Sequence, residues 1–184
     1  MFGQAHPNPM TADFDDLWVF GYGSLMWRPD FSYQERHLAQ LHGYHRSLCI
    51  FSHVHRGTPE APGLVLGLDR GGRCRGVAFR VAAEDREATI AYLRAREQVT
   101  AVYLERHVCI RIDDGRRVRA LTYVANRRHP QYAGRLPQGD LLRLVRQGVG
   151  MSGANPDYVR STHAHLIEIG VRDLTLAQIA AALS

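Results

Sequence analysis

The first residues that could do chemistry lie in a glycine-flanked turn that follows a strand-like apolar run, Leu17 to Phe20. Glycines let backbone groups approach a ligand closely, a serine hydroxyl donates or accepts, and a tyrosine offers a ring with a polar tip. The pattern predicts a loop that binds a small polar molecule, built from Val19, Phe20, Gly21, Tyr22, Gly23, Ser24 and Leu25. The open alternative is an ordinary strand-to-loop transition in which the glycines only permit the bend.

This turn does not match the common nucleotide-binding fingerprints. A Gly-x-Gly-x-x-Gly motif would need a third glycine where Met26 stands, and no Gly-Lys-Ser/Thr follows. We therefore do not expect the loop to bind a dinucleotide or the phosphates of a nucleotide.

A single carboxylate is the second candidate. Glu97 closes a helical run that begins at Tyr92, where the pattern changes from helix towards strand. The ordinary interpretation is a solvated glutamate paired three residues back with Arg94 or with another basic residue. On local grounds alone, Glu97 does not establish a catalytic site.

Histidine and cysteine chemistry is less well supported. The sequence contains two pairs of histidines whose members are two residues apart, His53 with His55 and His163 with His165. Neither pair has an evident third ligand in its own segment, so we expect no metal site. The chain has three cysteines, Cys49, Cys74 and Cys109, with no Cys-x-x-Cys spacing, and each lies in or beside an apolar strand-like segment. We expect their thiols to be buried, protonated and inert, in a protein of the reducing cytoplasm.

Composition narrows the class of protein. The 184 residues with 45% hydrophobic content predict a single domain over 17–184 after a flexible N-terminal arm over 1–16, which lacks the features of a signal peptide. No apolar run approaches the roughly 20 residues that a transmembrane helix requires, so we expect no membrane partner. The net charge of +5 comes from 23 basic residues, all arginine and scattered, against 18 acidic ones, which favours a small anionic substrate over nucleic acid.

Periodicity indicates an α+β fold. Strand-like segments recur at 17–22, 44–51, 63–68, 75–81, 103–112 and 118–124, and helical patterns at 84–96, 139–148, 155–169 and 175–183. The turn-forming sequences 69–72 and 113–115 predict two hairpins between antiparallel strands. We expect a mainly antiparallel sheet or small barrel with surrounding helices.

Five motifs in order make the chain resemble a known family. They are Gly21-Tyr22-Gly23-Ser24-Leu25, the turn-rich segment 55–63, Tyr92-Leu93-x-x-Arg96-Glu97, the segment 128–134 and Asn155-Pro156-Asp157-Tyr158. Over about Trp18 to Leu174, the chain resembles the ChaC-type, glutathione-specific γ-glutamylcyclotransferases.

The resemblance implies a reaction that needs no cofactor. The α-amine of a γ-glutamyl group attacks its own γ-carbonyl, closes 5-oxoproline and expels the attached amine, which for glutathione is Cys-Gly. Glu97 matches the family's catalytic glutamate, as general base and then general acid, and the Val19 to Leu25 loop matches its substrate-binding segment. Arg56 is expected to meet a substrate carboxylate and Tyr132 to contribute a hydroxyl, although both could equally stabilise loops.

One departure from the family pattern concerns substrate choice. Members carry Gly-Gly-Tyr soon after the glutamate, whereas this chain reads Ala101-Val102-Tyr103 after Gln98-Val99-Thr100. Two other functions stay open: a cyclotransferase for other γ-glutamyl compounds, and a noncatalytic module that binds γ-glutamyl or amino-acid ligands and does not require Glu97. The oligomeric state is not predicted.

Overall fold

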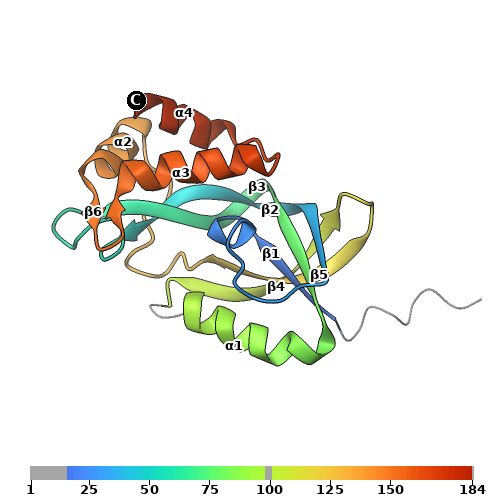
Figure 1. Ribbon diagram of the computed structural model, residues 1–184. Coiled ribbons are helices and arrows are strands. Elements are labelled where there is room, and N and C mark those ends of the chain that lie inside the picture. Colours follow the sequence, from blue (N-terminus) through green and yellow to red (C-terminus); the bar gives the residue numbers. More distant parts are fainter. Residues whose placement is uncertain (1–15, 98–100, 184) are drawn as a thin grey trace, which may run out of the picture.

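The computed structural model describes residues 16–97 and 101–183 (Figure 1). The predicted N-terminal arm lies outside the described residues apart from Asp16. Along the chain the elements are β1 (Leu17–Gly21), η1 (Ser24–Met26), β2 (Glu35–Ser52), β3 (Gly63–Val81), η2 (Ala83–Asp85), α1 (Arg86–Glu97), β4 (Tyr103–Ile112), β5 (Arg117–Ala125), α2 (Gln138–Gln147), β6 (Val149–Gly150), β7 (Gly153–Ala154), α3 (Asn155–Glu168) and α4 (Leu174–Ala182).

Five strands form a closed barrel in the order β1-β3-β2-β4-β5. Neighbouring strands are antiparallel except β1 and β5, which close the barrel in parallel. Figure 1 shows α1 on one side of the barrel, and α2, α3 and α4 gathered on the opposite side. The predicted α+β fold is confirmed, and all four predicted helices are present with ends shifted by less than a turn.

One predicted hairpin is present and the other is wrong. The turn at 113–115 joins β4 to β5, with the amide of Gly115 donating to the carbonyl of Ile112 at 3.0 Å. The segment 69–72 does not reverse the chain, because β3 runs through it and pairs with an equally long β2. Gly71 and Gly72, both at positive φ, form an irregularity opposite Gly43 that bends the long ribbon without ending it.

The cysteines differ in their surroundings. Cys49 and Cys74 are buried, and burial raises the pKa of the Cys49 thiol to about 12, so these two fit the expected inert thiols. Cys109 is exposed, which corrects the expectation that it is buried. It alternates with buried Ile110 along β4 and therefore faces outwards. None of the described helices combines the length and apolar character needed to cross a membrane.

Candidate active site

A cavity of about 100 Å³ opens where the end of β1 meets the end of α1. Residues of β1, β3, α1, β4, β5 and α3 form its walls together with the loop after β1. The lining residues are Phe20, Tyr22, Gly23, Ser24, Leu25, Leu66, Glu97, Tyr103, Thr122, Tyr123 and Tyr158. The cavity therefore brings together two predicted site features that are far apart in sequence, the glycine-flanked loop and Glu97.

Five of the seven predicted loop residues line this cavity. The exceptions are Val19, which is fully buried in an apolar cluster with Leu93, and Gly21, which pairs with Val77 as the last residue of β1. Gly23 has φ −130° and ψ −134°, outside the main regions open to residues with a Cβ atom. The predicted need for unusual backbone geometry thus applies to Gly23, whereas Gly21 is an ordinary extended residue.

The loop presents unpaired backbone donors. Within the described part of the chain, the amides of Gly23, Ser24 and Leu25 have no hydrogen-bond acceptor. They stand at the start of η1, and the next amide, that of Met26, already donates to the carbonyl of Gly23 at 2.9 Å. Successive free N–H groups at a turn are suited to bind an anion or an oxygen that gains negative charge.

A buried arginine holds this loop from behind. Arg46 in β2 donates to the carbonyl of Tyr22 at 2.6 Å, to the carbonyl of Arg75 at 2.7 Å and to the carboxylate of Asp173 at 3.1 Å. Because a trans peptide is planar, with C=O and N–H on opposite sides, fixing the Tyr22 carbonyl also fixes the direction of the Gly23 N–H. Asp173 in turn caps α4 by accepting from the Leu176 amide at 3.0 Å.

Glu97 reaches the cavity because α1 is anchored on its inner side by fully buried Leu93. Of the two pairings that the ordinary interpretation allowed, the one with Arg94 is absent, since Arg94 binds Glu105 in β4 through two bonds of 2.8 and 2.9 Å, and the one with another basic residue is present with Arg96. The Glu97 side chain is only 19% exposed. Burial raises the pKa of its carboxyl group, and the neighbouring Arg96 guanidinium partly opposes this rise.

Arg96 connects the end of α1 to the loop. Its guanidinium donates to the Ser24 hydroxyl oxygen at 2.7 Å, to the Arg28 carbonyl at 3.0 Å and to the Tyr92 hydroxyl at 2.8 Å. Its Nε lies 3.4 Å from a carboxylate oxygen of Glu97. With its N–H groups directed at these protein acceptors, Arg96 is placed to orient cavity residues.

Tyrosines form much of the remaining wall. The Tyr103 hydroxyl donates to the carbonyl of Leu66 at 2.7 Å, and the Tyr158 hydroxyl oxygen accepts from the Leu66 amide at 3.1 Å. Burial raises the pKa of Tyr22, Tyr103 and Tyr158, so these phenols stay neutral beside Glu97. Sequence reasoning assigned no site role to Tyr103 or Tyr158, although both lie in motifs that it singled out.

Metal binding finds no support among residues 16–97 and 101–183, where no group of three histidine, cysteine or acidic side chains is placed to hold an ion. In the two histidine pairs, Nδ1 of His55 lies 3.0 Å from the Ser152 hydroxyl, and His165 stacks on Trp27 with ring centroids 4.6 Å apart. These contacts are ordinary polar and packing interactions.

Comparison with known proteins agrees with this geometry. The ChaC-like protein family model matches residues 17–184. The chain belongs to the ChaC-like family. It is 37% identical over 161 residues to the glutathione-specific γ-glutamylcyclotransferase of Escherichia coli K12, covering 88% of this chain and 70% of that protein. Identity to human glutathione-specific γ-glutamylcyclotransferase 1 is 36% over 152 residues, covering 80% of this chain and 68% of that protein.

The fold is also shared with solved structures. A yeast γ-glutamylcyclotransferase specific to glutathione superposes with a TM-score of 0.80 at 20% sequence identity, covering 92% of this chain and 96% of that chain. The ChaC-like barrel described above is therefore similar to the fold of a known cyclotransferase.

Two predicted residues of this ChaC-like protein lie outside the cavity wall. The Arg56 guanidinium lies over the ring of Tyr158, 5.3 Å from its centroid, and its Nη1 donates to the Ala154 carbonyl at 3.4 Å. The Tyr132 hydroxyl donates to a carboxylate oxygen of Asp69 at 2.8 Å. Arg56 thus contacts the cavity through Tyr158, whereas Tyr132 belongs to a separate polar cluster.

The backbone conformation at Ala101 bears on the departure from the ChaC-like Gly-Gly-Tyr pattern. Ala101 has φ +56°, a left-handed conformation that favours glycine. Val102 is buried and packs with Cys49, Ile50 and Ala125. The preceding Gln98, Val99 and Thr100 lie outside the described residues. An alanine therefore occupies a position whose geometry suits glycine.

Proposed function

We propose that this ChaC-like protein is a glutathione-specific γ-glutamylcyclotransferase that converts glutathione to 5-oxoproline and Cys-Gly. The supporting relatives in Escherichia coli and human carry that name. The observation that carries the proposal is one cavity that holds both the partly buried Glu97 carboxylate and three free backbone donors. A base and an oxyanion site facing one substrate are what intramolecular acyl transfer requires.

The cavity holds the glutamyl end of the substrate. At about 100 Å³ it is smaller than the roughly 300–1,000 Å³ of typical whole-ligand pockets, so the Cys-Gly portion extends through the mouth. The amides of Gly23 and Leu25 and the Ser24 hydroxyl supply hydrogen bonds to the carbonyl oxygen. Neutral Tyr22, Tyr103 and Tyr158 shape the walls without adding charge.

Glu97 moves the protons. Its carboxylate takes a proton from the α-ammonium, and the freed amine attacks the γ-carbonyl carbon to form a five-membered ring. The electron pair of the carbonyl moves to oxygen, where the loop donors stabilise the negative charge. As the carbonyl re-forms, the C–N bond to cysteine breaks, and protonated Glu97 gives its proton to the departing nitrogen. The regenerated carboxylate then takes the second proton from the ring nitrogen and passes it to the Cys-Gly amine, so a neutral lactam and an ammonium group leave.

The environment of Glu97 suits this exchange. A general base works best when its pKa lies near the working pH, and burial moves the Glu97 pKa upwards in that direction. Arg96 acts in the opposite direction and lowers this pKa, which favours the carboxylate form that a base requires. No water is consumed and no covalent enzyme intermediate forms in this scheme.

Arg56 and Tyr132 take no part in the proton transfers of this scheme. Arg56 supports the Tyr158 wall, and we propose that it meets the outer carboxylate of the substrate where this extends past Tyr158. Tyr132 instead stabilises its own loop, because its hydroxyl donates a hydrogen bond to Asp69. A cytoplasmic location, where glutathione is kept reduced, completes the proposal.

The experiment is release of 5-oxoproline and Cys-Gly from glutathione by the purified protein and by Glu97→Gln, with γ-glutamyl-alanine as a parallel substrate. Stoichiometric formation of both products by the wild type, lost in the variant, is the expected result. Product from γ-glutamyl-alanine alone would indicate a cyclotransferase for other compounds. Tight glutathione binding without turnover would indicate a noncatalytic module.

A further inference from the structure

The barrel gathers arginines that are scattered in the sequence onto one outer face. Register places Arg75 of β3 opposite Gln40 of β2, Gln40 opposite Arg111 of β4, and Arg111 opposite Arg117 of β5. Side chains opposite one another project from the same side of a sheet. One row across four adjacent strands therefore carries three arginines.

A second row adds two more. Arg73 stands opposite His42 on β3 and β2, and Arg119 stands opposite Cys109 on β5 and β4. The five arginines of the two rows are all exposed: Arg73, Arg75, Arg111, Arg117 and Arg119. We call this surface the arginine face.

The arginines of this face are not paired with carboxylates of the described residues. Among residues 16–97 and 101–183, none of its five side chains forms an ion pair or hydrogen bond with a carboxylate. Like charges directly opposite one another, such as Arg111 and Arg117, destabilise a sheet. A bound anion would remove this repulsion.

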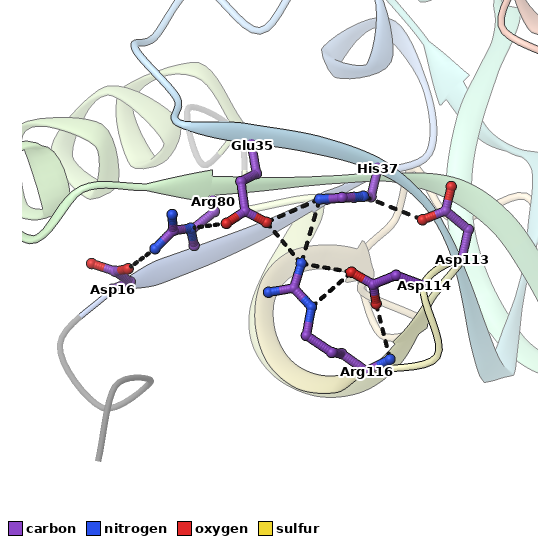
Figure 2. A network of polar contacts seen from close by, with 7 residues as sticks. All are labelled: Asp16, Glu35, His37, Arg80, Asp113, Asp114 and Arg116. Atoms are coloured by element: carbon purple, nitrogen blue, oxygen red, sulfur yellow. Dashed lines mark hydrogen bonds and ion pairs between the residues drawn. The ribbon is translucent and has the colours of Figure 1, made fainter. Parts of the chain in front are cut away.

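Figure 2 shows a network of four carboxylates that pair with other basic residues, and it includes Asp113, which lines the hollow described below. Arg116 lies 2.7 Å from Glu35 and 2.7 Å from Asp114, and Arg80 lies 2.7 Å from Glu35. Asp113 lies 3.2 Å from Nδ1 of His37. The network holds four carboxylates against two arginines and His37 and so carries excess negative charge of its own, but among the described residues none of these carboxylates pairs with an arginine of the face.

The face is also hollowed. A cavity of about 300 Å³ is lined by Arg75, Arg111 and Gln40, by the His37-bound Asp113, and by Leu38, Ala39 and Ile112. It shares no lining residue with the Glu97 cavity. Because strands lie about 4.8 Å apart, the two arginines stand on strands about 10 Å from each other, close enough for one compact anion to contact both.

We propose that this hollow is a binding site for a compact oligophosphate, separate from the active site. Guanidinium groups match phosphate oxygens with paired N–H donors. The two rows carry no aromatic platform on which the bases of a single strand would stack other than the His42 ring. The exposed large apolar side chains that could enter a membrane, such as Met151 and Leu174, lie elsewhere.

The test uses inorganic tripolyphosphate in isothermal titration calorimetry at constant ionic strength. The variant Arg75→Gln/Arg111→Gln is compared with Arg135→Gln/Arg172→Gln, which removes two exposed arginines away from the face and changes the net charge equally. We expect saturable one-to-one binding, weakened at least about tenfold (about 1.4 kcal/mol) in the first variant and less than about twofold in the second. Glutathione cleavage stays unchanged in both.

Three results would overturn the proposal. No saturable binding by the wild type would show that the face holds no such site. Equal loss in both double variants would reveal a diffuse field instead of a site. Tighter binding of single-stranded RNA or of phosphatidylserine vesicles, at equal phosphate concentration and sensitive to the same two arginines, would assign the face to a macromolecular surface.

Discussion

Arg96 donates a hydrogen bond to the hydroxyl oxygen of Ser24 across 2.7 Å and ties the last turn of α1 to the loop after β1. With its oxygen engaged as an acceptor, the Ser24 hydroxyl directs its proton elsewhere. A charged donor at the oxygen also makes this O–H group a stronger donor in turn. Arg96 is thus a positioning residue for Ser24 as well as a neighbour of Glu97.

Ser24→Ala and Arg96→Gln should each lower kcat on glutathione by about 100-fold, because a donor to the developing oxyanion is lost or misdirected. If Arg96 acts mainly through Ser24, the double variant loses little more than Arg96→Gln alone. Arg94→Gln, in the same helix but bound to Glu105, is the control and should stay within about twofold of wild type. Fully additive losses in kcat would show that the two residues act independently.

The pH dependence of kcat/KM should report Glu97. Because burial raises its pKa and the proposed reaction uses the carboxylate, we expect activity to fall as pH drops through this raised value. Arg96 lowers the same pKa, so Arg96→Gln should move the acidic limb to higher pH. The other titratable groups around Glu97 are the phenols of Tyr22, Tyr103, Tyr123 and Tyr158, which stay neutral over this range. An unmoved limb in Arg96→Gln would contradict the assignment.

Glu97→Gln should also stabilise the fold. A carboxyl whose pKa is raised on folding costs stability wherever it is ionised in both states, which is above the raised pKa. The gain in Tm should therefore be largest at mildly alkaline pH and disappear below the pKa of the unfolded state, where both states are protonated. Thermal denaturation of wild type and variant across pH measures it. A gain in Tm that increases towards acidic pH would contradict a raised Glu97 pKa.

Arg46→Met should lower the free energy of unfolding by about 3–5 kcal/mol, because it leaves Asp173 and two carbonyl groups without a buried partner. Asp173→Asn is the matched variant: it removes the ion pair and retains a side-chain oxygen to cap α4. We expect it to cost less than Arg46→Met. Urea denaturation of both variants checks the order, and the reverse order would place the main role of Arg46 at α4.

Ala101→Gly should raise the free energy of unfolding by about 0.5–1 kcal/mol. The left-handed conformation at Ala101 costs an alanine about 1–2 kcal/mol of folding free energy, which glycine does not lose. Glycine has a more flexible unfolded state, and this reduces the gain in stability by about 0.5–1 kcal/mol. The same substitution at exposed Ala95, within α1, should lower stability by about 1 kcal/mol. Equal effects of both substitutions in urea denaturation would contradict the strain at Ala101.

Local sequence patterns predicted most of the elements. Helices appeared where the apolar period was 3.6 residues, and the turn at 113–115 appeared where Asp-Asp-Gly interrupted two strands. The hairpin predicted at Gly71 and Gly72 was wrong because glycine is typical of both turns and β-bulges. Whether such glycines reverse a strand or bend it depends on the partner strand, here β2, whose first half carries too weak an alternation to be recognised.

Residue types at short spacing were enough to predict the glycine-flanked loop and the glutamate as site residues and to identify the family. Tertiary structure alone decided that Glu97 is partly buried beside the free amides of that loop, since closing the barrel through β1 and β5 brings them together. It also decided that arginines dispersed along the chain share one face. Strand register is a long-range property, so no local pattern contains it.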